Sequence, residues 1–494
     1  MKYALTFLLL CCGALGFLQA NNITVSNVTL IGQDAAAGTT QIQFDLSWEN
    51  SWRISVGPGN YDAAWVFAKY RVNGGAWRHA TLQNTGNVAA AGSTIDVADN
   101  VGAFIYRSAD GSGDVDWQNL QLRWDYDANG VDDNAVVDVQ VFAIEMVYVP
   151  EGAFRMGSPL SGAADLRGEF FTRTAPPISL QVPYEVTSEA AITVANGQGT
   201  LFYANNEPGA NNNGDQLGPI PAAFPKGFNA FYCMKYETSQ EQWVAFFNSL
   251  TPAQQANLDL TGSMGKNSDE VQLRNGISWA DNGNATTSLP NVAVNYAATL
   301  MTLAYLDWSG LRPFTELEYE KACRGPLAPV ASELAWGNAN VTSTLYEVSN
   351  AGAPNEGVSN PGVGTGNMVF FTSTAIGPLR VGALAASAVN STREESGGSY
   401  YGIMELSGNL YERAVTVGNP AGRAFTGAHG DGVITTAGAA NVTGWPTTAT
   451  GIGYRGGSYS NTVPFCAVSD RFDAATTLTN GNARLGFRGA RTAQ

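Results

Sequence analysis

The sequence predicts an all-β sandwich domain followed by an α+β domain with many irregular loops. Residues 22–145 alternate apolar and polar side chains in short runs bounded by Gly, Asn and Asp, which is the period of strands with one buried face. Near Met146 this alternation gives way to short amphipathic stretches separated by long loops. The chain also holds 56 Gly and only 14% charged residues, as expected for a loop-rich β protein.

Residues 1–20 have the pattern of a secretory signal peptide. Lys2 precedes an apolar run over residues 4–18, and the small residue Ala20 stands before polar Asn21. The run is too short to anchor the chain in a membrane, and we expect cleavage after Ala20. No later stretch of the sequence is apolar over the length of a membrane span. The mature protein is therefore predicted to be secreted and to act extracellularly or at the cell surface.

Composition excludes several classes of function. A net charge of −16 repels nucleic acids and anionic membranes, so nucleic-acid binding is rejected, whereas calcium binding is favoured. His79 and His429 are the two histidines of the chain, so a three-histidine zinc or iron site cannot form. The sequence also lacks the Gly-x-Ser-x-Gly elbow of many serine hydrolases.

The first domain, residues 21–145, is expected to contain at least five antiparallel strands. Alternation is clearest over residues 23–30, 41–48, 64–72, 119–124 and 135–142. Asn73-Gly74 between two of these runs is a favourable hairpin turn. The acidic turn that follows Trp124 offers a calcium candidate, because Asp125, Asp127 and Asn129 alternate ahead of Gly130. Val136 stands at the twelfth position of that loop, where calcium loops carry a bidentate carboxylate, so a plain Asn-Gly hairpin is an equal alternative.

The second domain, residues 146–494, is predicted to contain three short helices. Ser239 and Gln242 form a capping box at the start of a helix over residues 239–250, and residues 295–308 form another helix. A third helix begins at Thr315 and stops at Gly325. Residues 160–226 match neither the helical nor the strand period, and we expect them to form an inserted, partly strand-like excursion on the surface.

Six motifs of this second domain occur in the order found in the formylglycine-generating enzyme, or sulfatase-modifying factor, family. They are Met156-Gly157-Ser158, the segments 231–238, 311–325, 334–338 and 402–412, and a C-terminal set that comprises Arg455-Gly-Gly-Ser-Tyr459, Cys466, Arg471 and Gly486-Phe487-Arg488. The chain therefore resembles this family from Met146 to Arg491. The resemblance implies a fold similar to a C-type lectin, with a small twisted sheet, two helices and irregular loops.

The resemblance also implies calcium as a cofactor. Carried over by position, the ligands in the turn over residues 402–412 are the side chains of Glu405 and Glu412 and the carbonyl oxygens of Gly408 and Leu410. Carboxylates and carbonyls are the oxygen ligands that calcium prefers. A second calcium site of the family falls near Asn350.

Active members of the family bind copper through two neighbouring cysteines, with which they oxidise a sulfatase cysteine to formylglycine. The two positions in this chain are Asn461 and Cys466. An amide oxygen is a poor substitute for a thiolate on Cu(I), so we expect no useful copper site. The resemblance thus implies a pseudoenzyme in which Asn461 and Cys466 are vestigial.

Three cysteines follow the signal peptide, and in an oxidising compartment one disulfide with one free thiol is expected. The resemblance to secreted relatives implies that Cys323 and Cys466 form this disulfide, which is favoured over a metal-ligand role for Cys466. Cys233 lies in an apolar segment and is expected to be a buried free thiol.

The leading hypothesis is a secreted, non-catalytic binding or structural surface protein stabilised by calcium. Its partner would be an extracellular protein or a glycan, recognised through residues 460–484, which are rich in Ser, Asn, Thr and Asp. One alternative is a copper or other metal-dependent oxidase of the formylglycine-generating type. Another alternative is self-association into an extracellular filament or surface layer.

Overall fold

The computed structural model describes residues 23–159, 167–174, 181–204, 212–371 and 376–493. The predicted signal peptide, residues 1–20, lies outside these described residues. No helix in the described part of the chain is long and apolar enough to cross a membrane.

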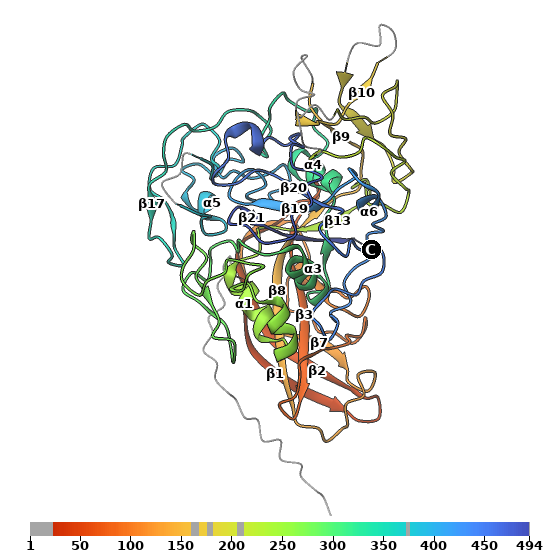
Figure 1. Ribbon diagram of the computed structural model, residues 1–494. Coiled ribbons are helices and arrows are strands. Elements are labelled where there is room, and N and C mark those ends of the chain that lie inside the picture. Colours follow the sequence, from red (N-terminus) through yellow and green to blue (C-terminus); the bar gives the residue numbers. More distant parts are fainter. Residues whose placement is uncertain (1–22, 160–166, 175–180, 205–211, 372–375, 494) are drawn as a thin grey trace, which may run out of the picture.

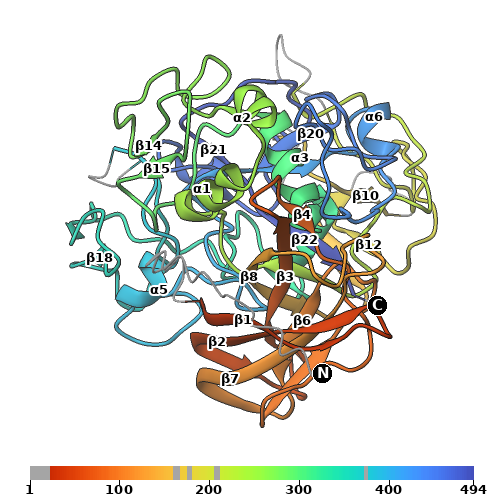
Figure 2. The same ribbon diagram turned by 90° about the horizontal axis from the view of Figure 1, so that it is seen from below.

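The N-terminal region forms two packed sheets, as the alternating runs predict (Figures 1 and 2). One sheet has the antiparallel order β1-β2-β7, made of β1 (Thr24–Asp34), β2 (Thr39–Arg53) and β7 (Gly111–Asp125). The facing sheet contains β3 (Asp62–Val72), β4 (Arg78–His79), β5 (Ser93–Asp96), β6 (Ala103–Arg107) and β8 (Val137–Val149). Between them lies an apolar core that includes Ile42, Phe44, Ala64, Val66, Leu120, Leu122 and Trp124.

The facing sheet does not stop at the end of the sandwich. Its strand order is β16-β22-β13-β8-β3-β6-β5, and β16 (Arg312–Pro313), β22 (Gly489–Thr492) and β13 (Phe231–Met234) belong to the C-terminal region. β8 pairs with β3 over most of its length and with β13 from Met146 to Val149. The expected boundary between residues 145 and 146 therefore falls inside a strand, because one long strand serves both regions.

The predicted helix caps are confirmed for two helices. Ser239 caps α1 (Gln240–Asn248), with reciprocal bonds of 3.2 and 3.0 Å to Gln242. Thr315 caps α4 (Glu316–Arg324) in the same way, and Gly325 follows with a φ of 64°. The helix expected from residue 295, α3 (Thr299–Trp308), begins later, because Tyr296 takes a left-handed φ of 65° that no helix can contain.

The remaining elements are short. They are β9 (Phe154–Met156), β10 (Thr172–Arg173), β11 (Gln181–Val182), β12 (Tyr184–Val186), α2 (Pro252–Leu258), β14 (Ile277–Ser278), β15 (Thr286–Thr287), β17 (Val348–Ser349), β18 (Gly357–Val358), α5 (Ala383–Ser387), β19 (Tyr411–Val415), α6 (Pro420–Arg423), β20 (Ile452–Arg455), the 3-10 helix η2 (Val463–Cys466) and β21 (Leu485–Gly486). β19 lies between β20 and β21 in a small second sheet of the C-terminal region.

In the described part of residues 160–226 many side chains are exposed, as expected of a surface segment. This part also contains short strands, β10 to β12. However, its apolar side chains are buried in the largest core cluster, namely Phe170, Val186, Ile192, Leu201, Tyr203, Ile220 and Phe224. The burial of these side chains was not predicted, because they are spaced irregularly and match neither the helical nor the strand period.

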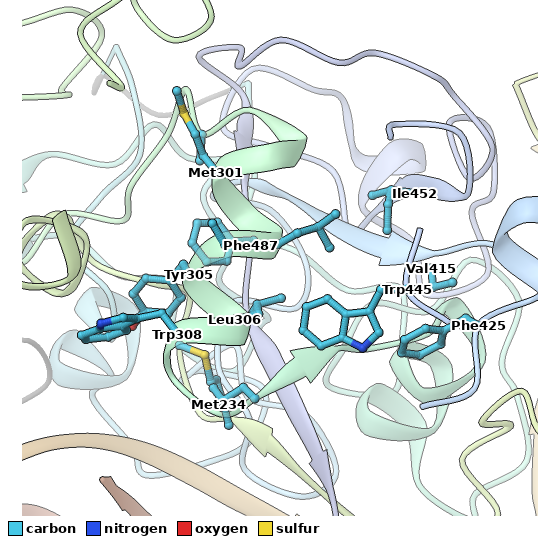
Figure 3. Close-up of a cluster of buried hydrophobic side chains, with 14 of the residues drawn as sticks. Met234, Met301, Tyr305, Leu306, Trp308, Val415, Phe425, Trp445, Ile452 and Phe487 are labelled. Atoms are coloured by element: carbon cyan, nitrogen blue, oxygen red, sulfur yellow. The ribbon is translucent and has the colours of Figure 1, made fainter. Parts of the chain in front are cut away.

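The largest core cluster surrounds α3. Tyr305 packs edge to face on Phe487 with ring centroids 5.3 Å apart, and Trp308 packs on Phe246 at 5.2 Å. Figure 3 shows these α3 side chains beside Met234 of β13, with Trp445 and Phe425 on the other side of the helix. This core fixes α3 against the long sheet and thereby supports the C-terminal loops.

Candidate functional site

The C-terminal segment that carries the predicted site runs from β20 through a Gly-Gly turn and η2 to β21. Two glycines make the turn possible. Gly456 and Gly457 have φ values of 91° and 69°, which side chains other than that of glycine rarely adopt. A Cβ on Gly457 would lie 2.4 Å from Sγ of Cys466. The turn therefore packs directly against η2, and it places Asn461 and Cys466 on the same short loop.

The two residues at the copper position do not offer a pair of thiolates. Asn461 Oδ1 accepts a hydrogen bond of 2.5 Å from Ser458 Oγ. Cys466 is completely buried among Leu334, Trp336, Met368 and Phe370, and this burial raises the pKa of its thiol. Cu(I) sites need soft, deprotonated sulfur ligands. The residues present therefore do not fit the copper ion of the family.

The expected Cys323–Cys466 disulfide is absent: Cys233, Cys323 and Cys466, the cysteines among the described residues, are all free. Cys323 on α4 and Cys233 on β13 belong to one apolar cluster, whereas Cys466 belongs to another beneath η2. Burial also raises the pKa of Cys233 to about 12, as expected for the buried thiol that was predicted there. The disulfide prediction was wrong because the two thiols sit in separate clusters.

A buried network of ion pairs holds the C-terminal segment against α4. Glu316 accepts hydrogen bonds from Arg455 at 3.0 Å and from Arg471 at 2.7 and 3.0 Å. Glu320, one helical turn later, accepts from Arg455 at 2.8 Å and from Arg324 at 3.1 Å. Burial raises the pKa of Glu316, but the guanidinium groups outweigh burial and hold that pKa below its usual value. Every charge in this network is thus paired, as buried charges require.

Arg471 also ties the segment to residues 160–226. Its guanidinium lies 4.1 Å from the ring centres of both Phe170 and Tyr203. It further donates to the carbonyls of Gly168 at 2.9 Å and Asn213 at 3.2 Å. Arg471 therefore joins α4 to the 160–226 region at one buried point, and it shares Glu316 with Arg455 of β20.

Above this rigid base the predicted recognition segment, residues 460–484, alternates between buried and exposed positions. Exposed side chains are Ser460, Thr462, Pro464, Thr477, Leu478, Thr479, Asn480 and Arg484. The backbone N–H of Phe371, whose side chain is 68% exposed, donates to the Asn461 carbonyl at 3.0 Å. The segment is thus a mainly polar surface with a few apolar groups. It is held to α4 by the buried ion pairs of Arg455 and Arg471.

The turn predicted to bind calcium is assembled only in part. Both carboxylate oxygens of Glu412 accept from Arg488, at 2.6 and 2.5 Å, in a buried bidentate ion pair. Glu405 Oε1 accepts from the backbone of Gly382 at 2.9 Å, whereas its buried Oε2 has no hydrogen-bond partner. Glu405 thus retains a free ligand atom, as calcium would need, but Glu412 is already paired with a cation.

Glu237 is a further acidic residue of this site that the sequence analysis missed. It is fully buried and accepts from the backbone N–H of Leu410 at 2.9 Å and from the Asn409 amide. Burial, followed by the charges of Glu412 and Glu405, raises its pKa well above the usual range. The one signal in the sequence is that Glu237 stands within the motif over residues 231–238.

These carboxylates do not converge on one point. Among the described residues, no group of three or more His, Cys, Asp or Glu side chains is placed to hold a metal ion. The carboxyl groups of Glu237, Glu405 and Glu412 nevertheless share the single guanidinium of Arg488, and burial raises the pKa of each. Glu412 is therefore occupied by Arg488, whereas Glu405 keeps one oxygen without a hydrogen-bond partner.

The other two calcium candidates have different surroundings. Asn350 is exposed, with a left-handed φ of 50° and a 3.5 Å contact from its amide to the Asn355 carbonyl. In the acidic turn after β7, Asn129 Oδ1 accepts from Trp124 Nε1 at 2.7 Å and from the Thr81 backbone at 3.0 Å.

The two aspartates of the same turn contact other parts of the protein. Asp125 accepts from Gln83 at 3.1 Å and from the backbone of Ala128 at 2.9 Å. The Asp127 side chain packs against Gly38, where a Cβ would lie 2.3 Å from it. Asp125 and Asn129 are therefore engaged in hydrogen bonds within the protein. The turn is not the hairpin expected as the alternative either, because β7 and β8 belong to different sheets.

Comparison with known proteins identifies the class to which this fold belongs. A family model of the sulfatase-modifying factor enzyme 1-like domain matches residues 136–493. Because the match covers most of the sequence, the chain belongs to this family, and the structure has mostly β content with N-terminal β-sheets. No curated protein matches the chain.

Among solved structures, Treponema denticola variable protein 1 is similar at 12% sequence identity, over 71% of this chain and 96% of that chain. The TM-score of 0.31 is too low to support an inference about this protein.

Proposed function

We propose that this protein is a secreted, non-catalytic binding protein of the extracellular surface, built on a sulfatase-modifying factor scaffold. The observation that carries the proposal is the state of Asn461 and Cys466. The amide oxygen of Asn461 is bonded to Ser458, and the Cys466 thiol is completely buried. Oxidation of a peptide thiol through copper needs two accessible sulfur ligands, which these residues do not supply.

The base beneath residues 460–484 supports a role in binding. Recognition surfaces work best when variable polar loops stand on a rigid support. Here Arg455 and Arg471 hold both ends of η2 and its flanking loops to α4 through fully buried ion pairs. The proposal places the scaffold in an α+β, C-type-lectin-like class, with residues 460–484 as the contact surface.

A Cu(I) titration of the mature protein tests the non-catalytic assignment. A competing chromophoric chelator would report affinity, and an oxygen electrode would report turnover of a Cys-Thr-Pro-Ser-Arg peptide. We expect weak copper binding and no oxygen uptake. Asn461→Cys should bind Cu(I) more tightly than the wild type, and Thr477→Cys, which adds an exposed thiol in the same segment, should not. Tight copper binding by the wild type with aldehyde formation would overturn the proposal.

We further propose that calcium stabilises the domain at Glu405, Gly408 and Leu410. The unpartnered Oε2 of Glu405 and the three buried carboxyl groups that share Arg488 support this site. A ligand that binds only the folded state raises its stability by about 3 kcal/mol at 100 times the dissociation constant. Calcium should therefore raise the melting temperature of the wild type and leave that of Glu405→Gln unchanged. Equal shifts in both proteins would place the ion elsewhere.

A further inference from the structure

A cleft of about 460 Å³ lies where the sandwich meets the C-terminal region. Its walls come from β3, β4, the acidic turn after β7, the residues that join α1 to α2, α2 itself, α3 and the loop over residues 432–434. They include Trp77, Arg78, Asn129, Gln254 and Trp308. Figure 2 shows β4 on the side of the sandwich nearest to α3. Small-ligand sites typically have this volume and occur where two structural units meet.

Lys69 lies buried at the floor of this cleft. Its Nζ is 2.7 Å from the Trp308 carbonyl, 2.6 Å from the Gly432 carbonyl and 2.9 Å from His79 Nδ1. His79 Nε2 lies 2.6 Å from the Val101 carbonyl, so Nε2 carries the hydrogen and Nδ1 accepts. Burial lowers the pKa of Lys69, but only an ammonium can donate to three acceptors at once, so the hydrogen bonds describe a charged lysine.

The charge of the cleft differs from that of the whole protein. The chain has 42 acidic and 26 basic residues, yet the described residues that line the cleft include Lys69 and Arg78 and no Asp or Glu. The carboxylates of Asp307 and Asp431 lie near Lys69 and stabilise its charged form. Neither residue lines the cleft. Arg78 is exposed, and no ion pair of its guanidinium occurs with another described residue. Arg78 is therefore a cation available to a ligand.

Trp77 provides a flat apolar surface beside this cation. The guanidinium of Arg71 lies 4.7 Å from the centre of the Trp77 ring and covers one of its faces. Trp77 is half-buried and lines the cleft, so part of its side chain is open to a ligand. A tryptophan face binds the C–H surface of a sugar ring, and an arginine fork binds a carboxylate through two parallel hydrogen bonds.

We propose that this cleft binds an acidic sugar unit, in which Trp77 stacks on the pyranose ring and Arg78 pairs with the carboxylate. Lys69, at the floor, is balanced by Asp307 and Asp431, so Arg78 is the cation that selects an acidic ligand. A neutral sugar would lack the ion pair, and a small anion without a ring would lack the stacking surface. The class of ligand is thus a uronic-acid residue of an extracellular glycan.

Titration calorimetry on the full mature chain tests this proposal. The probe is a trisaccharide of galacturonic acid, compared at fixed ionic strength with a neutral galactose trisaccharide and with citrate. We expect the uronate to bind at least 10-fold more tightly than either comparison ligand. Arg78→Gln and Trp77→Ala should each weaken binding about 10-fold or more, because one removes the ion pair and the other the stacking surface.

Arg155→Gln is the matched control, since Arg155 is also exposed but lies on β9, outside both the cleft and residues 460–484. It should bind the uronate as the wild type does. Should Trp77→Ala unfold, Trp77→Phe keeps a smaller ring and should give an intermediate affinity. Failure of the uronate to bind, equal affinity for the neutral sugar, or full affinity in Arg78→Gln would overturn the proposal. None of these results bears on the copper titration, so the two proposals fail independently.

Discussion

At the scale of single residues, Gly457 shows how closely the C-terminal turn is packed. An added Cβ would meet both the left-handed φ of 69° and the Cys466 sulfur at 2.4 Å. We expect Gly457→Ala to lower the free energy of unfolding by about 3 kcal/mol, from backbone strain and overpacking together. Urea unfolding at 25 °C measures the loss.

Gly74→Ala is the control for that substitution. Gly74 has nearly the same φ, 68°, but nothing lies within 4 Å of its Cβ position. Its substitution should cost only the strain of the left-handed backbone, about 1 to 2 kcal/mol. Equal losses of unfolding free energy in the two variants would mean that η2 shifts away from the added methyl group without loss of stability.

The buried Glu405 predicts a dependence of stability on pH. Burial raises the pKa of Glu405 from 4.5 to about 7, although Arg488 opposes the shift. The folded state thus binds the proton more tightly than the unfolded state. The stabilisation from this proton is complete below pH 4.5 and is lost as the pH rises to 7, by about 3 kcal/mol at most.

In calcium-free buffer we therefore expect the wild type to lose stability between pH 5 and pH 8, and Glu405→Gln to lose less. Glu185→Gln, which alters an exposed surface pair with Arg155, should keep the wild-type slope. Denaturant unfolding at several pH values gives the comparison. If the free energy of unfolding depended on pH in the same way in the wild type and in Glu405→Gln, Glu405 would not be the source of the pH dependence.

The role of a single side chain could be predicted where the residues that it contacts are close to it in sequence. It could not be predicted where those residues are distant in sequence. Asn461 and Cys466 lie on one loop, and their spacing from the Gly-Gly turn identified them as the two copper-ligand positions of the family. The disulfide prediction failed because Cys323 and Cys466 are far apart in sequence and lie in different apolar clusters. Glu237 was missed because its partner Asn409 is 172 residues away.

At the scale of secondary-structure elements, α4 carries the ion pairs that position the candidate surface. Glu316→Gln removes a charge that neutralises two buried guanidinium groups, those of Arg455 and Arg471. Removal of one partner of a buried pair typically costs about 3 to 5 kcal/mol. We expect a loss of this size in chemical denaturation. The exposed pair of Arg155 and Glu185 is the matched comparison, and Glu185→Gln should cost less than about 1 kcal/mol.

Elements with local signals were predicted well. The capping boxes at Ser239 and Thr315 lie within four residues of chain, so the sequence contains all of the information that sets those helix ends. The start of α3 depends instead on the left-handed Tyr296, whose carbonyl lies 1.7 Å from where a Cβ on the distant Gly481 would stand. Such contacts have no local signature.

At the scale of the whole molecule, the long sheet joins regions that the sequence suggested were separate domains. β8 contributes to both, and Lys69 of β3 bonds to carbonyls of α3 and of the loop at Gly432. We therefore expect one cooperative unfolding transition in calorimetry, with equal calorimetric and van't Hoff enthalpies. Two resolved transitions would show that the sandwich and the C-terminal region are independent.

The position of β22 in the sheet has a consequence for biosynthesis. β22 lies between β13 and β16, and its residues 489–492 come after nearly all the rest of the chain. A chain emerging from a ribosome or a translocation pore cannot close the sheet until this last strand is released. The edges of β13 and β16 that β22 covers therefore stay unpaired until late in synthesis, and a bulky fusion placed directly after β22 should hinder folding more than one placed before β1.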